Sequence, residues 1–320
     1  MRRVAALLAV LAVTAAAAGC GDEDAEPGAP QGATLVLDFL PNAVHSGIYT
    51  ALARDFYRDA GVDLDVRPPG ESTDGPKLLA AGRVQFAVLD IHDLGLARER
   101  GIPVVGVAAI VQRPLASVIA RRQPGVVSPR DLEGGQVGVT GLPSDDAVLD
   151  SVVAGSGGDP AAVDRVTIGF NAVSALAAGR VDAATGFWNA EAVALRSQGI
   201  PIRVFRVDDY GAPTYPELVL CTSEEIAAKQ PGLVRAVTAA TERGYEAVLR
   251  DPDAGLADLL AANPGLDEAQ QRAQLETLLP AFEPPGRLDP AALRAWARWD
   301  AEHGILRRPP VIEDAFAPPG

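Results

Sequence analysis

Apolar and polar residues follow one another in blocks along the chain, in the order strand, turn, helix, turn, strand. The stretch from Leu35 to Val66 shows this pattern most clearly. Its first apolar run has the length of a strand and is broken at Pro41-Asn42. Apolar residues then recur at helical spacing over Ser46–Tyr57, and Gly61 is placed to end that helix. The rest of the stretch alternates apolar and charged residues, which predicts a half-solvated strand.

Further units of the same kind follow, and they predict parallel sheets with right-handed crossovers. One group of units extends to about residue 111, and a second group covers about 136–171. A short repeat links the two groups: LAAGRVQFA begins at Leu79 and LAAGRVDAA begins at Leu176, so Gly82 and Gly179 lie 97 positions apart (179 − 82). The fold class predicted is therefore α/β, with two lobes of like construction, each a mostly parallel sheet flanked by helices, and a ligand cleft between them.

Helical patterns separated by Pro or Gly fill the chain after about residue 231 and predict a helical C-terminal region. The predicted boundaries place the first segment of lobe 1 at 33–118 and lobe 2 at 119–218. Residues 219–320 are expected to return to lobe 1 and to add the C-terminal helices.

The first 20 residues have the composition of a targeting segment. Arg2-Arg3 precedes an apolar stretch and small residues, and the segment ends in Ala17-Ala18-Gly19-Cys20. This ending resembles a bacterial lipobox with alanine in place of the more usual leucine, which predicts lipidation of Cys20. An ordinary secretory signal with a chance cysteine is the alternative. Residues 21–32 are acidic and rich in Pro and Gly, and are expected to form a flexible linker.

Charge and cysteine content exclude several classes of function. The chain has 28 basic and 42 acidic residues, a net charge of −14, which argues against nucleic acid and anionic membrane surfaces as partners. Cys221 lies in an apolar run and is expected to be a buried small side chain, with no disulfide if Cys20 is acylated. The spacing of Cys and His suggests no metal site.

The turn after the first strand concentrates groups suited to recognition. Within eight residues it holds the carboxylate, aromatic ring, amide and imidazole of Asp38, Phe39, Asn42 and His45. Ligands of parallel α/β units bind where strands end and helices begin. The alternative is a capped turn with Phe39 in the core.

Four segments carry a resemblance to a known family: LDFLPNAVHSGIYTAL, PPGES, AAGRVQFAVLD and LARERGIPVVGVAAIVQ. They resemble the solute-binding proteins of importers for thiamine pyrimidine precursors, a group related to the fungal hydroxymethylpyrimidine phosphate synthase. The resemblance covers roughly residues 33–280, and Phe39 stands where the family usually has tryptophan. It implies a two-lobed periplasmic-binding-protein (Venus flytrap) fold and an aminopyrimidine ligand. An ABC permease with its ATPase is the implied partner, and the implied location is extracytoplasmic, on the cell membrane.

The resemblance also implies which residues contact the ligand. They are Asp38, Phe39, Asn42 and His45 in the first lobe and Gly141, Pro143, Ser144, Trp188, Asn189 and Glu191 in the second, with Tyr210 and Tyr215 as weaker candidates. An aminopyrimidine needs aromatic faces and a carboxylate that accepts from its exocyclic amine. Structural roles remain open for several of these residues: a core position for Trp188, a helix-start glutamate at Glu191 and a locally bonded imidazole at His45.

Two other functions are weighed against this one. A sulfonate, taurine or nitrate binder needs cationic or amide donors, whereas the predicted strand-end loops hold Asp38, Glu71, Asp90 and Glu191 and little arginine. A synthase resembling the fungal enzyme needs a lysine that carries pyridoxal phosphate. Here Asp90 stands at that strand end, and only Lys77 lies near a predicted loop. No enzymatic activity, cofactor or metal is therefore expected.

Overall fold

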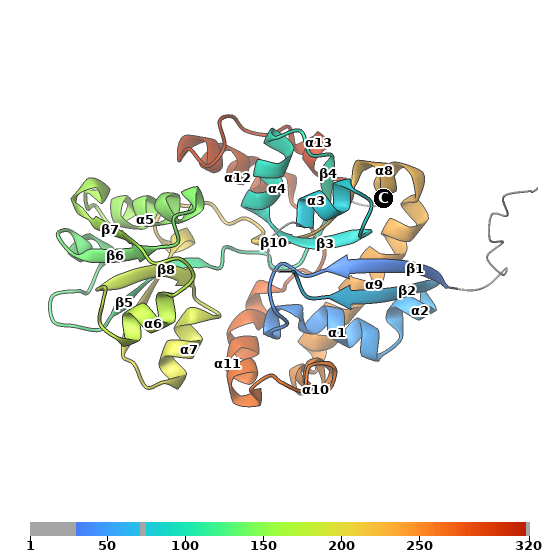
Figure 1. Cartoon of the computed structure of the whole chain (residues 1–320), viewed down its shortest axis with the longest axis horizontal. Coiled ribbons are helices and arrows are strands. Elements are labelled where there is room, and N and C mark those ends of the chain that lie inside the picture. Colours follow the sequence, from blue (N-terminus) through green and yellow to red (C-terminus); the bar gives the residue numbers. More distant parts are fainter. Residues whose placement is uncertain (1–29, 71–74, 318–320) are drawn as a thin grey trace, which may run out of the picture.

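The computed structural model describes residues 30–70 and 75–317, which form two lobes (Figure 1). The first lobe is built on a five-stranded sheet in the order β2-β1-β3-β10-β4. β1 is parallel to β2 and β3, whereas β10 is antiparallel to both of its neighbours. The strands of this sheet are β1 (Gln31–Val36), β2 (Val62–Arg67), β3 (Phe86–Asp90), β4 (Val104–Ala109) and β10 (Leu218–Ser223).

The second lobe repeats this plan in the order β7-β6-β8-β5-β9. β6 is parallel to β7 and β8, and the fourth strand, β5, is antiparallel to β8 and β9. The predicted fold class, two mostly parallel sheets of like construction, is confirmed. The strands are β5 (Ala116–Arg121), β6 (Gln136–Val139), β7 (Asp164–Thr167), β8 (Ala183–Phe187) and β9 (Ile202–Arg206).

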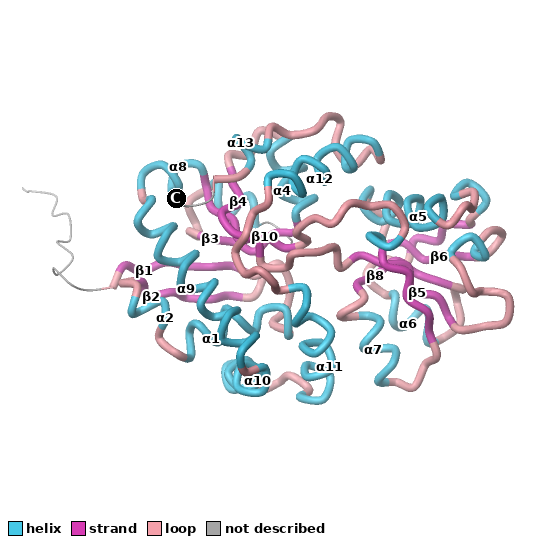
Figure 2. The backbone as a smooth tube through the Cα atoms, turned by 180° about the vertical axis from the view of Figure 1, so that it is seen from behind, coloured by secondary structure: helices cyan, strands magenta, loops and turns pink. Residues whose placement is uncertain are grey.

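The chain crosses between the lobes twice, and each crossing leads into the antiparallel fourth strand of a sheet. The first crossing ends at Ala116, where β5 begins, so the expected lobe boundary after residue 118 falls inside this strand. The second crossing ends at β10. The two crossing segments run side by side, since the backbone N–H of Glu217 donates to the carbonyl of Val111 at 3.1 Å, and Figure 2 shows both between the lobes.

The helices of the first lobe follow the predicted periodicity with one difference. The helix expected over Ser46–Tyr57 is broken at Asp55, which has φ of +56°, a left-handed conformation that Asp tolerates better than most residues. The break turns Tyr57 inward, where its hydroxyl lies 2.8 Å from that of Thr241. The segments are η1 (Ala43–His45), α1 (Ser46–Ala53), α2 (Phe56–Asp59), α3 (Gly75–Ala80) and α4 (Ile91–Glu99).

The helices of the second lobe occupy equivalent places between its strands. The repeat is reproduced in the backbone: Gly82 follows α3 with φ of +64°, and Gly179 follows the equivalent helix α6 with φ of +66°. The segments are η2 (Pro129–Leu132), α5 (Pro143–Gly155), η3 (Pro160–Ala162), α6 (Ala172–Ala177), α7 (Glu191–Ser197) and η4 (Val207–Asp209).

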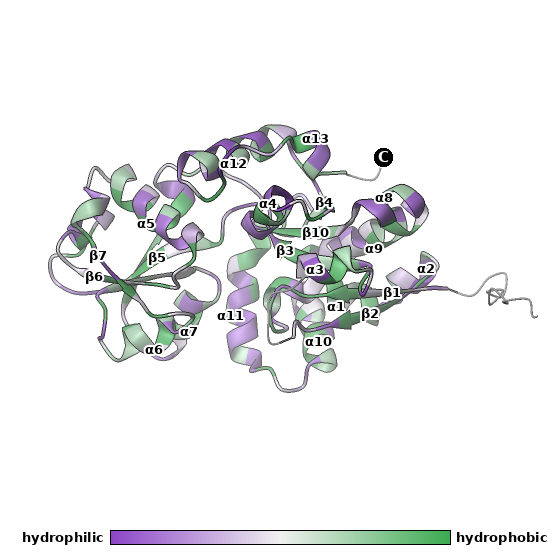
Figure 3. Ribbon diagram, turned by 45° about the horizontal axis from the view of Figure 1, so that its top comes forward, coloured by the Kyte–Doolittle hydropathy of each residue, from purple (hydrophilic) through white to green (hydrophobic). Residues whose placement is uncertain are grey.

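The C-terminal helices pack mainly on the first lobe, where α9 lies along α1 and α13 contacts β4. α11 also contacts α7 of the second lobe. Figure 3 shows that the strands of both sheets are largely apolar and that many of the helices around them combine polar and apolar residues. These segments are α8 (Glu224–Lys229), α9 (Pro231–Arg250), α10 (Pro252–Ala262), α11 (Glu268–Leu278), η5 (Leu279–Ala281), α12 (Pro290–Glu302) and α13 (Ile312–Ala315).

Packing confirms the predicted burial of Cys221, which is fully buried in β10. The tail after Arg307 is anchored by Phe316, which is buried against Trp296 and pairs with Gly106 of β4. Within the described residues, no helix combines the length and the apolar character needed to span a membrane.

The contact between α1 and α9 requires glycine on both helices and gives a test of the fold. A Cβ at Gly244 would lie 2.0 Å from the carbonyl oxygen of Gly47. We expect Gly244→Ala to lower the free energy of unfolding by about 1–3 kcal/mol, because the helices must move apart. Gly232→Ala, in the first turn of the same helix with nothing within 4 Å, is the control and should be neutral or slightly stabilising. Urea unfolding of the two variants measures the difference, and equal midpoints would contradict the close contact.

Candidate functional site

The carboxyl ends of the parallel strands provide the candidate site in both lobes. In the first sheet the strand order reverses direction between β1 and β3, and in the second between β6 and β8. Such points, outside the carboxyl ends of the strands, are where open α/β sheets bind ligands. The predicted site residues fall in the loops that follow β1, β6 and β8.

The loop after β1 is held in one conformation by His45. Its Nδ1 accepts the backbone N–H of Asn42 at 3.2 Å, so Nδ1 carries no proton, and Nε2 donates to Oδ1 of Asp38 at 2.8 Å. The side chain of Asn42 caps the same turn by accepting the N–H of Val44. The side chain of His45 is fully buried, whereas the side chain of Asp38, which it holds in place, is 19% exposed to solvent.

Apolar side chains at several strand ends are exposed to solvent. Phe39 is 60% exposed, so the alternative that it lies in the core is wrong. Leu40 is exposed beside it, and Leu142 after β6 and Phe170 after β7 are exposed on the second lobe. Leu142 and Phe170 were not predicted. Their position directly after a strand of the parallel sheet was the signal that could have identified them.

The loop between β6 and α5 contains Gly141, Pro143 and Ser144. Gly141 has φ of +95°, and Pro143 is the first residue of α5. Gly141 and Pro143 are exposed and Ser144 is half-buried. The loop is fixed by Asp145, which was not predicted: its Oδ2 accepts the N–H of Thr140 at 2.6 Å and the hydroxyl of Thr185 at 2.7 Å.

The loop after β8 contains Asn189 and leads to Glu191, whose carboxylate interacts with the charge of Asp145. The Oε2 atom of Glu191 accepts the N–H of Phe187 at 2.8 Å. Burial raises the pKa of Glu191, and the nearby charge of Asp145 adds to the effect. Asn189 is buried, and within the described residues its Oδ1 has no hydrogen-bond partner. Glu191 thus stabilises the start of α7 in this conformation, and its role toward a ligand remains a prediction.

Trp188 lies at the crossing between the lobes. It is 3% exposed, its indole N–H donates to the carbonyl of Pro114 at 2.8 Å, and its backbone N–H donates to the carbonyl of Leu115. The guanidinium of Arg206 covers the ring, 4.1 Å from its centroid. Because the ring of Trp188 is buried and covered by Arg206, stacking of a ligand on Trp188 would need the site to change shape.

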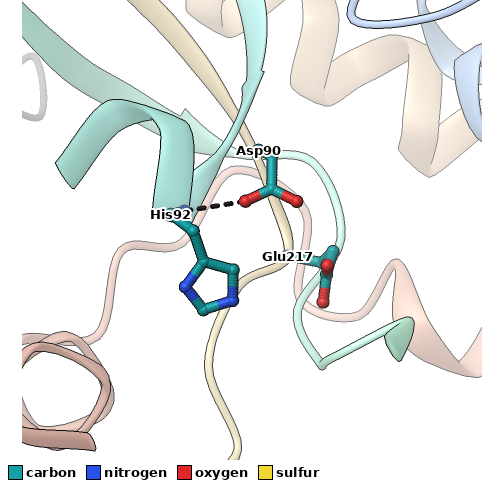
Figure 4. A group of neighbouring side chains, drawn as sticks. All are labelled: Asp90, His92 and Glu217. Carbon is teal, nitrogen blue, oxygen red and sulfur yellow. Dashed lines mark hydrogen bonds between the residues drawn. The ribbon is translucent and has the colours of Figure 1, made fainter. Parts of the chain in front are cut away.

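A second group of polar residues lies buried beneath the first-lobe strand ends. Figure 4 shows Asp90, His92 and Glu217 facing one another. His92 Nδ1 lies 2.9 Å from Oδ2 of Asp300, and Nε2 lies 3.2 Å from the hydroxyl of Tyr215. Asp90 lies beside the imidazole but accepts the backbone N–H of His92, at 2.7 Å.

The electrostatics of this buried group are unusual. Burial raises the pKa of Glu217 to about 8, and it also raises the pKa of Asp90. Burial opposes the charge on His92, but the carboxylates of Asp300 and Asp90 together raise its pKa to about 10. Tyr215 is fully buried within this group and Tyr210 is half-buried, so neither weaker candidate has an exposed ring.

The sequence of the chain is similar to those of proteins of known family. The NMT1/THI5-like family model matches residues 42–255. A formylaminopyrimidine-binding protein of Halalkalibacterium halodurans is 32% identical over 98% of this chain and 97% of its own. A 4-amino-5-hydroxymethyl-2-methylpyrimidine phosphate synthase of Legionella pneumophila is 26% identical over 78% of this chain and 79% of its own. The resemblance drawn from the sequence is confirmed.

A solved structure shows the same fold. The periplasmic aliphatic sulphonate binding protein SsuA of Escherichia coli superimposes with a TM-score of 0.73 at 14% identity, over 91% of this chain and 94% of its own. This similarity confirms the two-lobed periplasmic-binding-protein architecture.

The hydrogen bond from Trp188 to Pro114 can be tested against a matched tryptophan. Trp188→Phe leaves the buried carbonyl of Pro114 unpaired, which should lower the free energy of unfolding by about 1–3 kcal/mol more than ring truncation alone. Trp299→Phe is the control, because Trp299 is also buried but its indole N–H has no partner among the described residues. Chemical unfolding compares the two, and a larger loss for Trp299→Phe would show that packing dominates.

Proposed function

Because the chain belongs to the NMT1/THI5-like family, we propose that it is an extracytoplasmic solute-binding protein for a thiamine pyrimidine precursor. The precursor is of the formylaminopyrimidine or hydroxymethylpyrimidine type, and the protein delivers it to an ABC importer. The observation that carries the proposal is the similarity to the Halalkalibacterium binding protein, which extends over nearly the whole chain.

The chemistry of the strand-end loops supports an aminopyrimidine ligand. Asp38 is held in place by His45 and keeps part of its carboxylate exposed, so it can accept from an exocyclic amine. Phe39, largely exposed beside it, offers an aromatic face for the ring. Glu191 provides a second carboxylate from the other lobe. The site is therefore assembled from Asp38, Phe39, Asn42 and His45 on one side and Gly141, Pro143, Ser144, Trp188, Asn189 and Glu191 on the other.

Capture of the solute takes place by closure of the two lobes on it. The hinge consists of the crossing segments before β5 and before β10, because these are the connections through which one lobe can rotate against the other. The closed form is the one that the permease and its ATPase recognise.

Two alternatives are distinguished by chemistry. The fold is shared with sulfonate-binding proteins, and an anion would use N–H donors at the start of α5. The family also includes synthases, but the position after β3, where the resemblance places their lysine, is Asp90 here. A binding protein without catalytic residues agrees better with this site.

A ligand panel with one conservative variant tests the proposal. Calorimetry should detect binding of formylaminopyrimidine or hydroxymethylpyrimidine and none of taurine, alkanesulfonate or nitrate. Glu191→Gln keeps the shape of the side chain but loses a charge-assisted bond of about 1.5–3 kcal/mol. Affinity should therefore fall roughly tenfold to a hundredfold.

Glu225→Gln, on the exposed surface of α8, is the control and should bind as the unaltered protein does. Normal binding by Glu191→Gln would restrict this carboxylate to stabilising α7 and would leave Asp38 as the acceptor. Binding of a sulfonate in place of the pyrimidines would reject the proposed ligand class.

We further propose that the protein is held at the membrane by a lipid on Cys20. The signal segment (1–20) and the linker (21–32) lie outside the described residues, except for the last three positions of the linker. The support is the sequence Ala17-Ala18-Gly19-Cys20 and the acidic segment that follows it. Such a tether leaves the two lobes able to reach a permease in the same membrane.

Replacement of the cysteine tests the anchor. Cys20→Ser removes the thiol that would be acylated, so the protein should move from the membrane fraction to the soluble fraction. Cys221→Ser is the control, because the buried thiol of Cys221 is not expected to carry a lipid. Fractionation followed by immunoblotting measures the distribution, and a Cys20→Ser protein that stays with the membrane would refute lipidation.

A further inference from the structure

Asp90, His92 and Glu217 converge although they come from three different parts of the fold. Asp90 ends β3, His92 lies in the first turn of α4, and Glu217 directly precedes β10. One possible ligand atom from each residue lies within 4.8 Å of those of the other two. Figure 4 shows the ring edge of His92 turned toward Glu217, with the carboxylate of Asp90 close by.

The charges of this group are not balanced by the protein. Three carboxylates, those of Asp90, Glu217 and Asp300, surround one imidazole. Asp300 forms an ion pair with His92, and Glu217 and Asp90 each accept a backbone N–H, from Leu115 and His92 respectively. One imidazolium cannot balance three carboxylates, so the remaining charge must be neutralised by protons or by a cation that displaces the Nε2 proton of His92.

The surroundings of Asp300 favour a cation over protons as the group that neutralises these carboxylates. It is fully buried, its Oδ2 contacts Nδ1 of His92, and its Oδ1 has no partner in the described part of the chain. A carboxylate on one ring nitrogen is the arrangement that orients histidines whose other nitrogen binds a metal. The contact with Asp300 leaves Nε2 of His92 on the side of Glu217 and Asp90.

We propose that Asp90, His92 Nε2 and Glu217 bind one divalent transition-metal ion of the zinc or manganese class, with Asp300 as the residue that orients the imidazole. One imidazole and two carboxylates suit these ions better than they suit soft ions that prefer thiolates. Donors bound at about 2.1 Å around zinc lie about 3.4 Å apart, so atoms that are now up to 4.8 Å apart need to approach one another by at most about 1.4 Å (4.8 − 3.4). The hydroxyl of Tyr215, 3.2 Å from Nε2, has to move aside or take a further coordination position.

The ion would reach this site from the side of Asp90, because Asp90 is half-buried whereas His92 and Glu217 are buried. It would connect the end of β3 with the start of β10, and so would strengthen the crossing between the lobes. This site does not depend on the identity of the solute, and its test uses no pyrimidine.

Metal content and affinity test the site directly. The protein is treated with a chelator, dialysed against Zn²⁺ or Mn²⁺ and freed of excess ion, and the metal is measured by mass spectrometry. We expect about one ion per chain and a rise in the thermal unfolding midpoint, since an ion that binds the folded state stabilises it. Asp90→Asn and Glu217→Gln should each weaken binding at least tenfold, because each removes an anionic ligand.

Asp93→Asn is the matched control, because Asp93 is an exposed acid that directly follows His92 in α4. This variant should retain the ion. The visible spectrum of the Co²⁺-loaded protein should show the absorption of an ion with a low coordination number and nitrogen and oxygen ligands. His92→Gln should abolish this absorption. Circular dichroism establishes whether each variant is folded. If Glu217→Gln does not fold, Asp90→Asn decides the test. A protein that retains no ion, or an Asp90→Asn variant that binds it as well as the Asp93→Asn control, would show that protons alone neutralise the group.

Discussion

The contact on which the two-lobed arrangement depends is the hydrogen bond from the backbone N–H of Leu115 to the carboxylate of Glu217, 2.7 Å long and buried. It joins the two segments that cross between the lobes. The backbone of Glu217 adds to it, since its N–H donates to Val111 and its carbonyl accepts from Ile91. One residue therefore ties the end of β4, the starts of β5 and β10 and the first residue of α4 together.

This crossing also explains why the two sheets have the same plan. In each sheet the fourth strand, β5 or β10, is antiparallel and directly follows a crossing. It pairs with β8 or β3, the strand at which the strand order reverses. The carboxyl ends of β3 and β8 therefore lie next to the hinge. Loops at these ends can meet a ligand from two sides, and the buried side chains beneath them, Trp188 and Glu217, belong to the hinge itself.

The sequence was sufficient where short-range constraints decide the structure. Periodicity predicted most strands, though not β9, and most helices, and Gly82 and Gly179 marked equivalent helix ends because each needs a positive φ. It was insufficient where a partner lies far along the chain. His92 contacts Asp300 across 208 positions, and Phe316 covers Gly106, so no local pattern contains either contact. In the same way, the burial of Trp188 depends on the crossing segment that carries Pro114, and the break at Asp55 depends on the packing of Tyr57.

The strand-end acids share a feature that bears on recognition. Asp38 is fixed by His45 and Glu191 by the N–H of Phe187, so each carboxylate is oriented by a residue close to it in the chain, at the end of its own strand or in the turn after it. A side chain held in advance loses little conformational entropy when a ligand arrives, and its contribution to affinity is correspondingly larger. Exposed apolar side chains such as Phe39 and Phe170 have no such support and must be ordered by the ligand or by the opposite lobe. Directional selectivity should therefore reside in the acids, whereas the aromatic contacts contribute mainly by excluding water once the lobes close.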